Sequence, residues 1–433
     1  MRCVPSAVWG FSPLDEELAL LPGRLTPSLQ EAVVRLGTWM PFGRVVTELA
    51  FFTQVSLTEA TARRQTEAAG AAYVALQSAE VEHRERTTPP APAGPPVQLV
   101  SVDGVMVPLV HQEYAEVKTL VIGTVQPAVM EKGEAVVHCS DLSYFSRLAD
   151  AETFARAALV EIQRRGVERA GLVCAVTDGA EWIQGFLEMH CPAAVRILDF
   201  SHAAEYVADI GQTVFGEATP EFQTWLQTTL HELKQAAPDT GLETLRDMQQ
   251  ELPGGTRSPE KLEAMQTALN YLEKRRSAIA YAEFRKAGYP IGSGSVESGN
   301  KVVVEARLKG AGMHWARPHV NPLLALRNIA CNDRWGEAWP QIETQLRGAD
   351  RTRRQLRQQT RRAQRTAAQV ATGLSAIPIA GGEAVPAPPT PVARAVAQTP
   401  KPPYRPPATH PWRHAPIGRV RFKPYRSGPD AKL

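Results

Sequence analysis

The chain of 433 residues is long enough for two or three domains with sizeable cores, and its net charge of +3, 43% hydrophobic and 21% charged residues are ordinary for a soluble globular protein. No run approaches the roughly 18 apolar residues of a membrane-spanning helix, and the start lacks an apolar secretion signal, so we expect a cytoplasmic protein without a membrane partner. Its five cysteines are scattered and odd in number, so the sequence suggests neither a disulfide framework nor a zinc site.

Residues 1–86 are predicted to form a helical segment. Helical periodicity begins at Thr26, a residue suited to cap a helix, and continues to about Ala79. Ser56 followed by Glu59 is a capping-box pattern that predicts a second helix start within this segment. Two short helices around a tight turn, over about residues 41–70, are typical of a helix-turn-helix, although a packing hairpin in a helical domain would have the same pattern.

The second of these helices carries side chains suited to phosphate and base-edge contacts. They are Arg63, Arg64 and Gln65. Because a helix-turn-helix places its second helix in the major groove of DNA, these three residues are candidates for DNA binding.

A proline-rich segment at residues 87–97 is predicted to be a semi-rigid linker, and a sheet is predicted to follow it. Three segments rich in branched residues come first, and strand then alternates with helix. This order favours an α/β fold with a mixed sheet flanked by helices, as in a ribonuclease-H-like core. The predicted strands are residues 97–110, 116–126, 133–145, 171–177 and 193–200, and the predicted helices are residues 151–165 and a segment from about 180.

The first part of this core, residues 98–215, is followed by an all-helical pattern at 216–289, which we interpret as an insertion. Residues 290–345 would complete the core. Residues 346–433 form a basic tail, which we expect to be largely disordered after an arginine- and glutamine-rich helix. From residue 347 onward the chain has 17 Lys or Arg against 3 Asp or Glu, so this segment carries +14 and the rest carries −11.

Three carboxylates in unusual settings are the candidate catalytic residues. Asp103 and Asp178 are placed where a predicted strand runs out, and Glu297 lies just inside a helix that follows a Gly-Ser turn. Convergent carboxylates suit Mg²⁺, which prefers oxygen ligands, and two such ions about 3.5–4 Å apart can support attack and departure of oxygens at phosphorus. The hypothesis is a two-Mg²⁺ site, at which Mn²⁺ could substitute.

Each carboxylate also has a purely structural interpretation. Asp103 precedes a glycine and could form a hairpin turn, Asp178 could cap a helix, and Glu297 could simply stabilise the positive end of a helix. Glu181 and Glu305 are rival ligand candidates on the same predicted helices. The sequence pattern alone leaves these alternatives open.

Several motifs together resemble the DDE-type transposases of bacterial insertion sequences, most closely the Kra-like family. They are distributed from about Pro13 to Arg413, so the resemblance covers most of the chain. The strings that carry it include PLDEELALLPG, VDGVMVP, VTDGAEWI, LDFSHAAEY, IGSGSVESGNK, VEARLKGAGMHW and HPWR. The members of this family have a ribonuclease-H-like core divided by a helical insertion.

The resemblance implies that Asp103, Asp178 and Glu297 are the catalytic triad and bind two Mg²⁺ ions. It adds Asp199 and His202 as an auxiliary Asp-x-x-His pair, which would brace the site or contact DNA. Longer members carry cysteine pairs upstream that resemble a zinc ribbon, whereas this chain has only Cys3 there, so no zinc is expected.

Further candidates for DNA contact come from the segments after the third carboxylate. One group follows Glu297, and the other belongs to a stretch with eight arginines and a single acidic residue, Asp350. A solvated helix face is the alternative for both, although repeated like charge favours a polyanion as partner. The candidates are Arg307, Lys309, His314, Trp315, Arg353, Arg354, Arg361 and Arg362.

The sequence therefore predicts a DDE transposase that cleaves DNA at transposon ends and transfers the strand into target DNA, as a homo-oligomer when two ends are paired. Two alternatives remain. One is a nuclease of the same general fold that hydrolyses nucleic acid without joining it. The other is a truncated, catalytically inactive DNA-binding protein derived from a transposon.

Overall fold

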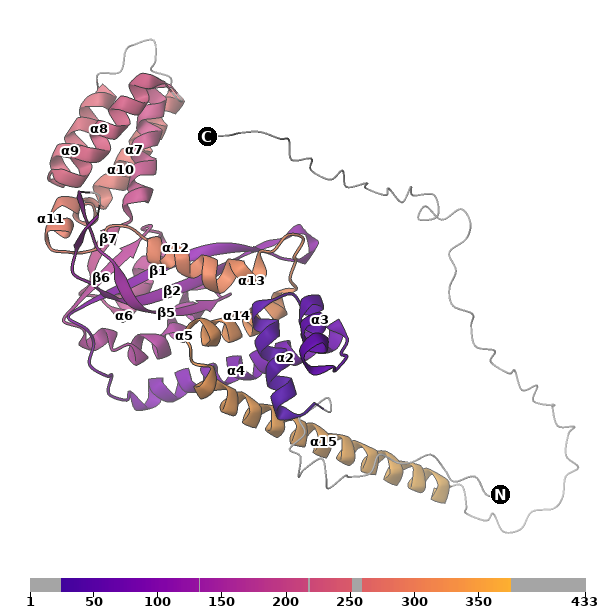
Figure 1. Cartoon of the computed structure of the whole chain (residues 1–433). Coiled ribbons are helices and arrows are strands. Elements are labelled where there is room, and N and C mark those ends of the chain that lie inside the picture. The colour runs from indigo at the N-terminus through magenta and orange to yellow at the C-terminus, as the bar shows by residue number, and fades with distance from the viewer. Residues whose placement is uncertain (1–24, 132, 217–218, 251–258, 375–433) are drawn as a thin grey trace, which may run out of the picture. The chain divides into compact units, whose positions relative to one another are not determined.

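A five-stranded mixed sheet forms the centre of the fold (Figure 1). The computed structural model describes residues 25–131, 133–216, 219–250 and 259–374. The strand order is β5-β2-β1-β6-β7, in which β1 pairs antiparallel with β2, β2 pairs antiparallel with β5, and β6 pairs in parallel with both β1 and β7. The strands are β1 (Val97–Pro108), β2 (Tyr114–Val125), β5 (Cys139–Arg147), β6 (Leu172–Thr177) and β7 (Val195–Leu198).

These strands confirm the predicted mixed α/β fold, because each predicted strand overlaps one of them. The third predicted segment, residues 133–145, is divided: its first residues form β4 (Glu134–Val136), which pairs with β3 (Val129–Glu131) in a separate hairpin. Only the part from Cys139 onward joins the main sheet. Branched residues in both parts give the same local signal, so the sequence pattern does not separate them.

Both faces of the sheet are covered, as the alternation of strand side chains requires. Val100 and Val102 belong to the cluster formed with α5 (Ala151–Arg164) and α6 (Glu181–His190). Leu99, on the opposite face, belongs to a cluster formed with the helices of residues 200–286. Near the far end of β1, Val107 packs instead with residues of the segment 303–324.

Helices alone are present in the described parts of the predicted insertion. They are α8 (Pro220–Gln235), α9 (Pro238–Gln250), α10 (Pro259–Lys274) and α11 (Tyr281–Lys286), with a single 3-10 turn at Arg276–Ala278, and α7 (Phe200–Phe215) leads into them from the core. The chain then returns to the sheet through α12 (Gly294–Gly299), a π-helix (Asn300–Glu305) and α13 (Ala306–Leu308). Two long helices complete the described chain, α14 (Arg317–Cys331) and α15 (Trp335–Leu374).

The edge strand β5 is protected by asparagines of α14. Asn328 accepts a hydrogen bond from the backbone N–H of Ser146 (2.9 Å) and donates one to its carbonyl (3.1 Å). Asn321 makes the same pair with Leu148, and Asn332 makes it with Tyr144. An uncovered edge strand presents unpaired backbone groups to other chains. On this edge, side-chain amides take the place of a further strand.

From Leu25, where the described residues begin, the N-terminal segment forms the helices α2 (Pro27–Trp39), α3 (Phe42–Thr53) and α4 (Glu59–Thr87). Thr26 caps α2 as predicted. The predicted capping box at Ser56 is wrong, because α4 begins at Glu59 and its cap is Thr58, which accepts from the N–H of Thr61 (3.2 Å). The N-cap is the residue immediately before the first helical residue, and Ser56 lies too far upstream of Glu59 to occupy that position.

The segments at the two ends of the predicted core differ from simple linkers. In the proline-rich stretch, the N–H of Gly94 donates to Arg169 and the carbonyl of Pro95 accepts from Gly171, so the stretch is held against the core. α15 continues without a break through the domain boundary expected at residue 346. The compact unit extends to Gln364, and residues 375–433 of the predicted tail lie outside the described residues.

In the part of the chain that the structure describes, no helix is both long and apolar enough to cross a membrane.

Candidate active site

Two of the predicted carboxylates lie where β1 and β6 separate. The parallel ladder ends with Val100 opposite Ala175. Asp103 and Asp178 each follow their paired residue by three positions, so they lie at the same level of the sheet. From the sequence we expected Asp103 at the end of a strand, but it lies within β1. It is not in a hairpin turn either, because β1 continues and pairs Asp103 with Thr119 of β2.

Asp178 lies in the turn that follows β6. Thr177 is the last residue of β6 and pairs with Leu198, the last residue of β7, so Asp178 and Asp199 are also at one level. The carboxylate of Asp178 accepts from the N–H of Ala180 (2.9 Å), but the cap of α6 is Ala180. Open α/β sheets bind ligands beyond the carboxyl ends of their strands, which is where these residues lie.

Glu297 is in the first turn of α12, as predicted. The helix approaches β2 closely at Gly299, where an added Cβ would lie 2.7 Å from the side chain of Val121. Ser293, the N-cap residue, donates its hydroxyl to the Glu297 carboxylate (2.8 Å). Glycine at position 299 thus lets the helix pack against the sheet and present Glu297 beside the strand ends.

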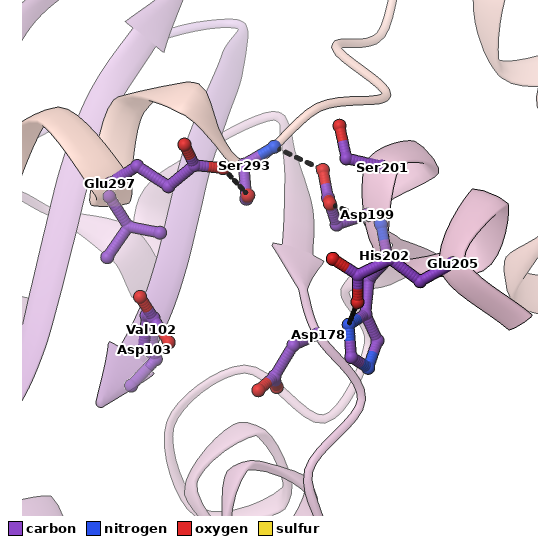
Figure 2. Close-up of a pocket in the computed structure, with 10 residues that line it drawn as sticks. Val102, Asp103, Asp178, Asp199, Ser201, His202, Glu205, Ser293 and Glu297 are labelled. Carbon is purple, nitrogen blue, oxygen red and sulfur yellow. Dashed lines mark hydrogen bonds and ion pairs between the residues drawn. The ribbon is translucent and has the colours of Figure 1, made fainter. Parts of the chain in front are cut away.

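Residues from all three segments line one pocket of about 230 Å³ (Figure 2). Asp103, Asp178 and Glu297 all line it, although their carboxylates are separated from one another across the opening. The remaining lining residues are Val102, Asp199, Ser201, His202, Glu205, Ser293 and Val296. Five carboxylates and no lysine or arginine face this pocket, so its electrostatic potential favours cations.

Asp103 is the most perturbed of these carboxylates. Partial burial, opposed by the hydrogen bond from the N–H of Gly104 (2.7 Å), raises its pKa to about 6, and the charges of Asp178 and Glu297 contribute to the increase. Its second oxygen accepts from the side-chain amide of Asn300 (2.7 Å). The charges of Asp178 and Glu297 therefore act on Asp103 across the pocket.

The π-helix after α12 accounts for the position of Asn300. Asn300 is its first residue and is buried, so the widened turn directs the amide to Asp103. The guanidinium of Arg327 in α14 donates to the carbonyl of Val303 (3.2 Å) and to that of Val302. Single π-turns are often found at functional sites, and here buried arginine satisfies carbonyls of the π-helix.

The two residues of the auxiliary pair have different surroundings. Asp199 is buried, caps α7 by accepting from the N–H of His202 (2.8 Å), and accepts from the N–H of Ser293 with its other oxygen (2.7 Å). It therefore ties the start of α7 to the turn before α12, the helix that carries Glu297. The ring of His202 pairs instead with Glu205 (3.2 Å).

Two predicted DNA contacts are wrong, because the side chains are in the interior. Arg307 is 1% exposed, donates to the carbonyl of Gly37 (3.0 Å), and lies between the rings of Phe42 and Trp315. Trp315 is also buried and donates to the carbonyl of Leu308 (3.0 Å). Both residues dock the N-terminal helices on the core, so neither is accessible to a ligand. Sequence spacing does not show which face of a short helix will be covered.

The other predicted DNA contacts are mostly on the surface. Arg63, Arg64 and His314 are exposed, and Lys309 is paired with Glu305 (2.7 Å). Gln65 is partly buried and accepts from Gln30 of α2 (2.7 Å). The four arginines of α15, which are Arg353, Arg354, Arg361 and Arg362, are exposed.

The donor chemistry of the pocket suits a hard divalent cation. In the described ranges, no three Asp, Glu, His or Cys side chains are close enough to hold one ion, so Asp103, Asp178 and Glu297 would have to converge further to do so. All three contribute carboxylate oxygens, the ligands that Mg²⁺ prefers. Burial is the main cause of the raised pKa of Asp103, and a cation would offset both this burial and the smaller repulsion from Asp178 and Glu297.

Sequence comparisons give no relative to set beside this site. The chain matches no protein-family model. No curated protein matches it with significant similarity.

Replacing Asp103 by Asn should stabilise the protein above pH 6 in the absence of divalent cations. The pKa of Asp103 is raised from 3.8 to about 6, so the folded wild type binds the proton more tightly than the unfolded chain and loses stability as pH rises through this window. Asn carries no charge at any pH. We expect a gain of about 2 kcal/mol at pH 7, allowing for partial exposure, measured by urea unfolding at several pH values.

The same series in 1 M NaCl separates the causes of this effect. Salt screens the charges of Asp178 and Glu297 but does not remove the cost of burial, so most of the gain should persist. If Asp103→Asn and the wild type show the same pH dependence, the carboxylate of Asp103 is not perturbed as described.

Proposed function

We propose that this protein is a DDE-type transposase that cleaves DNA and joins the cut end to target DNA, with two Mg²⁺ ions as its cofactor. The observation that carries the proposal is the pocket to which three distant segments contribute Asp103, Asp178 and Glu297. Asp178 follows the end of β6, Glu297 lies in the first turn of α12, and Asp103 lies in β1 just after β1 separates from β6. This placement supports a shared role. Neither rival, Glu181 or Glu305, lines this pocket.

The fold supports the same proposal. Three antiparallel strands followed by two parallel strands with helical connections form the order that we expect of a ribonuclease-H-like core. The helices α7 to α11 separate Glu297 from the two aspartates in the chain, as the resemblance implies. α3 and α4, joined by a short turn, are compatible with a helix-turn-helix, and exposed Arg63 and Arg64 lie on the second of them.

In this proposal Asp103, Asp178 and Glu297 would hold the metal ions, and each has a neighbour that orients it. Asn300 donates to Asp103, Ser293 donates to Glu297, and Asp199 holds Ser293 in place. Divalent ions supply charge stabilisation to attacking and leaving oxygens at phosphorus. The reaction would first hydrolyse a phosphodiester at the transposon end to release a 3′-hydroxyl. That hydroxyl would then attack a target phosphodiester and displace the 3′-oxygen of the target strand.

The charge of α15 supports DNA as the partner. Residues 351–368 are exposed along the whole helix, and the arginines there far outnumber the acidic residues. Arg354 is paired with Asp350 (2.6 Å), but one carboxylate cannot neutralise the segment. A long basic helix of this kind is favourable beside a polyanion, because phosphate contacts release counterions. A homo-oligomer that pairs two transposon ends, acting in the bacterial cytoplasm, completes the proposal.

The test is a strand-transfer assay with the full-length protein. DNA ends from the sequence flanking the gene, either intact or pre-cut to expose a 3′-hydroxyl, are incubated with plasmid target in Mg²⁺, in Mn²⁺ and in EDTA. Joining of the pre-cut end that depends on the divalent ion is the expected result. Cleavage without joining would indicate a nuclease, and binding without either reaction would indicate a DNA-binding protein without catalysis.

A further inference from the structure

The turn that carries Asp178 has little support from its own residues. It links Thr177 to α6, and Gly179 in it has a φ of +76°, which L side chains rarely adopt. Within the turn, Asp178 accepts from the N–H of Ala180, and the hydroxyl of Thr177 accepts weakly from the N–H of Gly179 (3.4 Å). The backbone carbonyls of Asp178 and Gly179 need partners from elsewhere.

Both partners come from the end of α10 in the helical insertion, where Tyr271 lies in the last turn and Arg275 directly follows the helix. The hydroxyl of Tyr271 donates to the carbonyl of Asp178 (2.5 Å), and the guanidinium of Arg275 donates to the carbonyl of Gly179 (2.6 Å). Tyr271 and Arg275 are one helical turn apart, and the guanidinium lies 3.7 Å from the centre of the Tyr271 ring. The two side chains thus form one unit that grips consecutive carbonyls.

The position of Tyr271 is itself determined by packing. Its ring stacks on that of Tyr206 in α7, with centroids 3.9 Å apart and planes 14° apart. The ring of His202, a lining residue of the pocket, meets Tyr271 edge-on at 6.0 Å. Tyr271 is therefore held between α7 and the turn, so its hydroxyl has little freedom to leave the carbonyl of Asp178.

Gly179 makes this close contact possible. A Cβ built at Gly179 would lie 2.6 Å from Nε of Arg275 and 2.8 Å from the hydroxyl of Tyr271. Any other residue at position 179 would push both side chains away from the turn. The glycine after the catalytic aspartate is thus required by the insertion as well as by the backbone conformation.

Attachment of the insertion to the core does not depend on this contact. Leu272, Ile279 and Tyr281 of the insertion are buried in one hydrophobic cluster with residues of β6 and β7. The hydroxyl of Tyr281 also donates to the carbonyl of Leu198 at the end of β7 (3.0 Å). Because these contacts already fix the insertion, the two bonds to the Asp178 turn have their main effect on the turn itself.

We propose that Tyr271 and Arg275 are positioning residues, which fix the backbone of the Asp178–Gly179 turn and thereby aim the Asp178 carboxylate into the pocket. This inference rests on the proposed function, since it takes Asp178 as a ligand of the divalent ion. It assigns the helical insertion a direct part in assembling the metal site, in addition to any contact with DNA.

The experiment measures Mn²⁺ binding to the full-length protein without DNA, by electron paramagnetic resonance of the free ion. Asp178→Asn serves as the reference for loss of a ligand. Tyr271→Phe and Arg275→Gln should weaken Mn²⁺ binding by roughly 10- to 100-fold, as is typical when residues that orient metal ligands are removed. Arg275→Lys retains the positive charge but not the planar donor group, so it should restore binding only in part.

Tyr281→Phe is the matched control. It removes a hydroxyl-to-carbonyl hydrogen bond of the same kind from the same insertion, but at Leu198 rather than at the Asp178 turn. It should lower the melting temperature about as much as Tyr271→Phe and leave Mn²⁺ affinity unchanged. In DNA cleavage, Tyr271→Phe and Arg275→Gln should lower kcat, whereas the affinity for DNA should stay the same.

The outcomes separate this proposal from the proposed function. If Asp178→Asn loses Mn²⁺ binding while Tyr271→Phe and Arg275→Gln retain wild-type affinity, the positioning role is refuted and the metal site stands. If Asp178→Asn binds Mn²⁺ as the wild type does, the metal site itself is refuted, and this proposal with it. Should either insertion variant fail to fold by circular dichroism, Gly179→Ala tests the same contact from the other side, and unchanged Mn²⁺ affinity in that variant would also refute the role.

Discussion

Asp178→Asn and Glu297→Gln should each lower the rate of Mg²⁺-dependent DNA cleavage by roughly a thousandfold and leave DNA binding almost unchanged. Both substitutions keep the size of the side chain and remove one negative charge. A bound ion contributes several kcal/mol of charge stabilisation at the reacting phosphate, and each 1.4 kcal/mol corresponds to a tenfold change in rate. The rate of cleavage is measured with labelled DNA under single-turnover conditions, and DNA binding by fluorescence anisotropy.

The rival carboxylates provide the controls for these two variants. Glu181 lies three residues after Asp178, in the first turn of α6, and Glu305 lies two turns after Glu297, where it pairs with Lys309. Glu181→Gln and Glu305→Gln remove the same charge from nearby positions in the chain that do not line the pocket. They should retain cleavage within about threefold. If Glu181→Gln lost cleavage while Asp178→Asn retained it, Glu181 would be the ligand. The same comparison of Glu305→Gln with Glu297→Gln decides between Glu305 and Glu297.

Asn328→Ala should destabilise the fold by about 3 kcal/mol. Asn328 is buried, and its amide makes both hydrogen bonds with the backbone of Ser146 on the edge strand β5. Alanine leaves a buried N–H and a buried carbonyl without partners, and each such group costs about 1–3 kcal/mol. Part of that cost is recovered if the strand edge opens to water. Urea unfolding followed by circular dichroism gives the free energy of unfolding.

An exposed asparagine of a helix gives the matched comparison. Asn270 in α10 accepts a hydrogen bond from Gln266 (2.9 Å) but is on the surface. Asn270→Ala should change the free energy of unfolding by less than about 0.5 kcal/mol. Asn328→Asp retains the acceptor oxygen, loses the donor and buries a charge, so it should be at least as destabilising as Asn328→Ala. Equal stability of the two alanine variants would show that the amides of α14 are not needed to close the sheet edge.

The site could be predicted in part because two of its three carboxylates are in local settings that the sequence indicates correctly. Asp178 follows a short apolar strand, and Glu297 follows a glycine-serine turn, so the elements that carry them are apparent from residue patterns. Their orienting partners are less apparent. Asn300 and Ser293 are spaced three and four residues from Glu297, which is the spacing of neighbours on a helix, and this signal was available. Tyr271 and Arg275 gave none, because about 90 residues separate them from Asp178.

The side chains near α13 show the opposite error. Arg307 and Trp315 have the composition of a DNA-binding surface, yet they are buried between the N-terminal helices and the core. The rings of Phe42 and Trp315 cover the faces of the buried guanidinium and the carbonyl of Gly37 accepts from it, which offsets part of the cost of burying Arg307. Of these partners only Trp315 is near Arg307 in the sequence, whereas Phe42 and Gly37 belong to the N-terminal segment. The local pattern of charge therefore gave no indication that Arg307 is buried.

The amino-acid sequence by itself determined the type and order of the main elements: the five strands of the central sheet, the helices between them and the helical stretch before Glu297. Hydrophobic periodicity and capping residues act over a few residues, which is why they can be recognised in a sequence. Only the tertiary structure decided which carboxylates share a pocket, which arginines are covered, and which amides and hydroxyls hold the backbone in place. Those outcomes depend on contacts between segments separated by tens to hundreds of residues, and on the cost of burying each polar group without a partner.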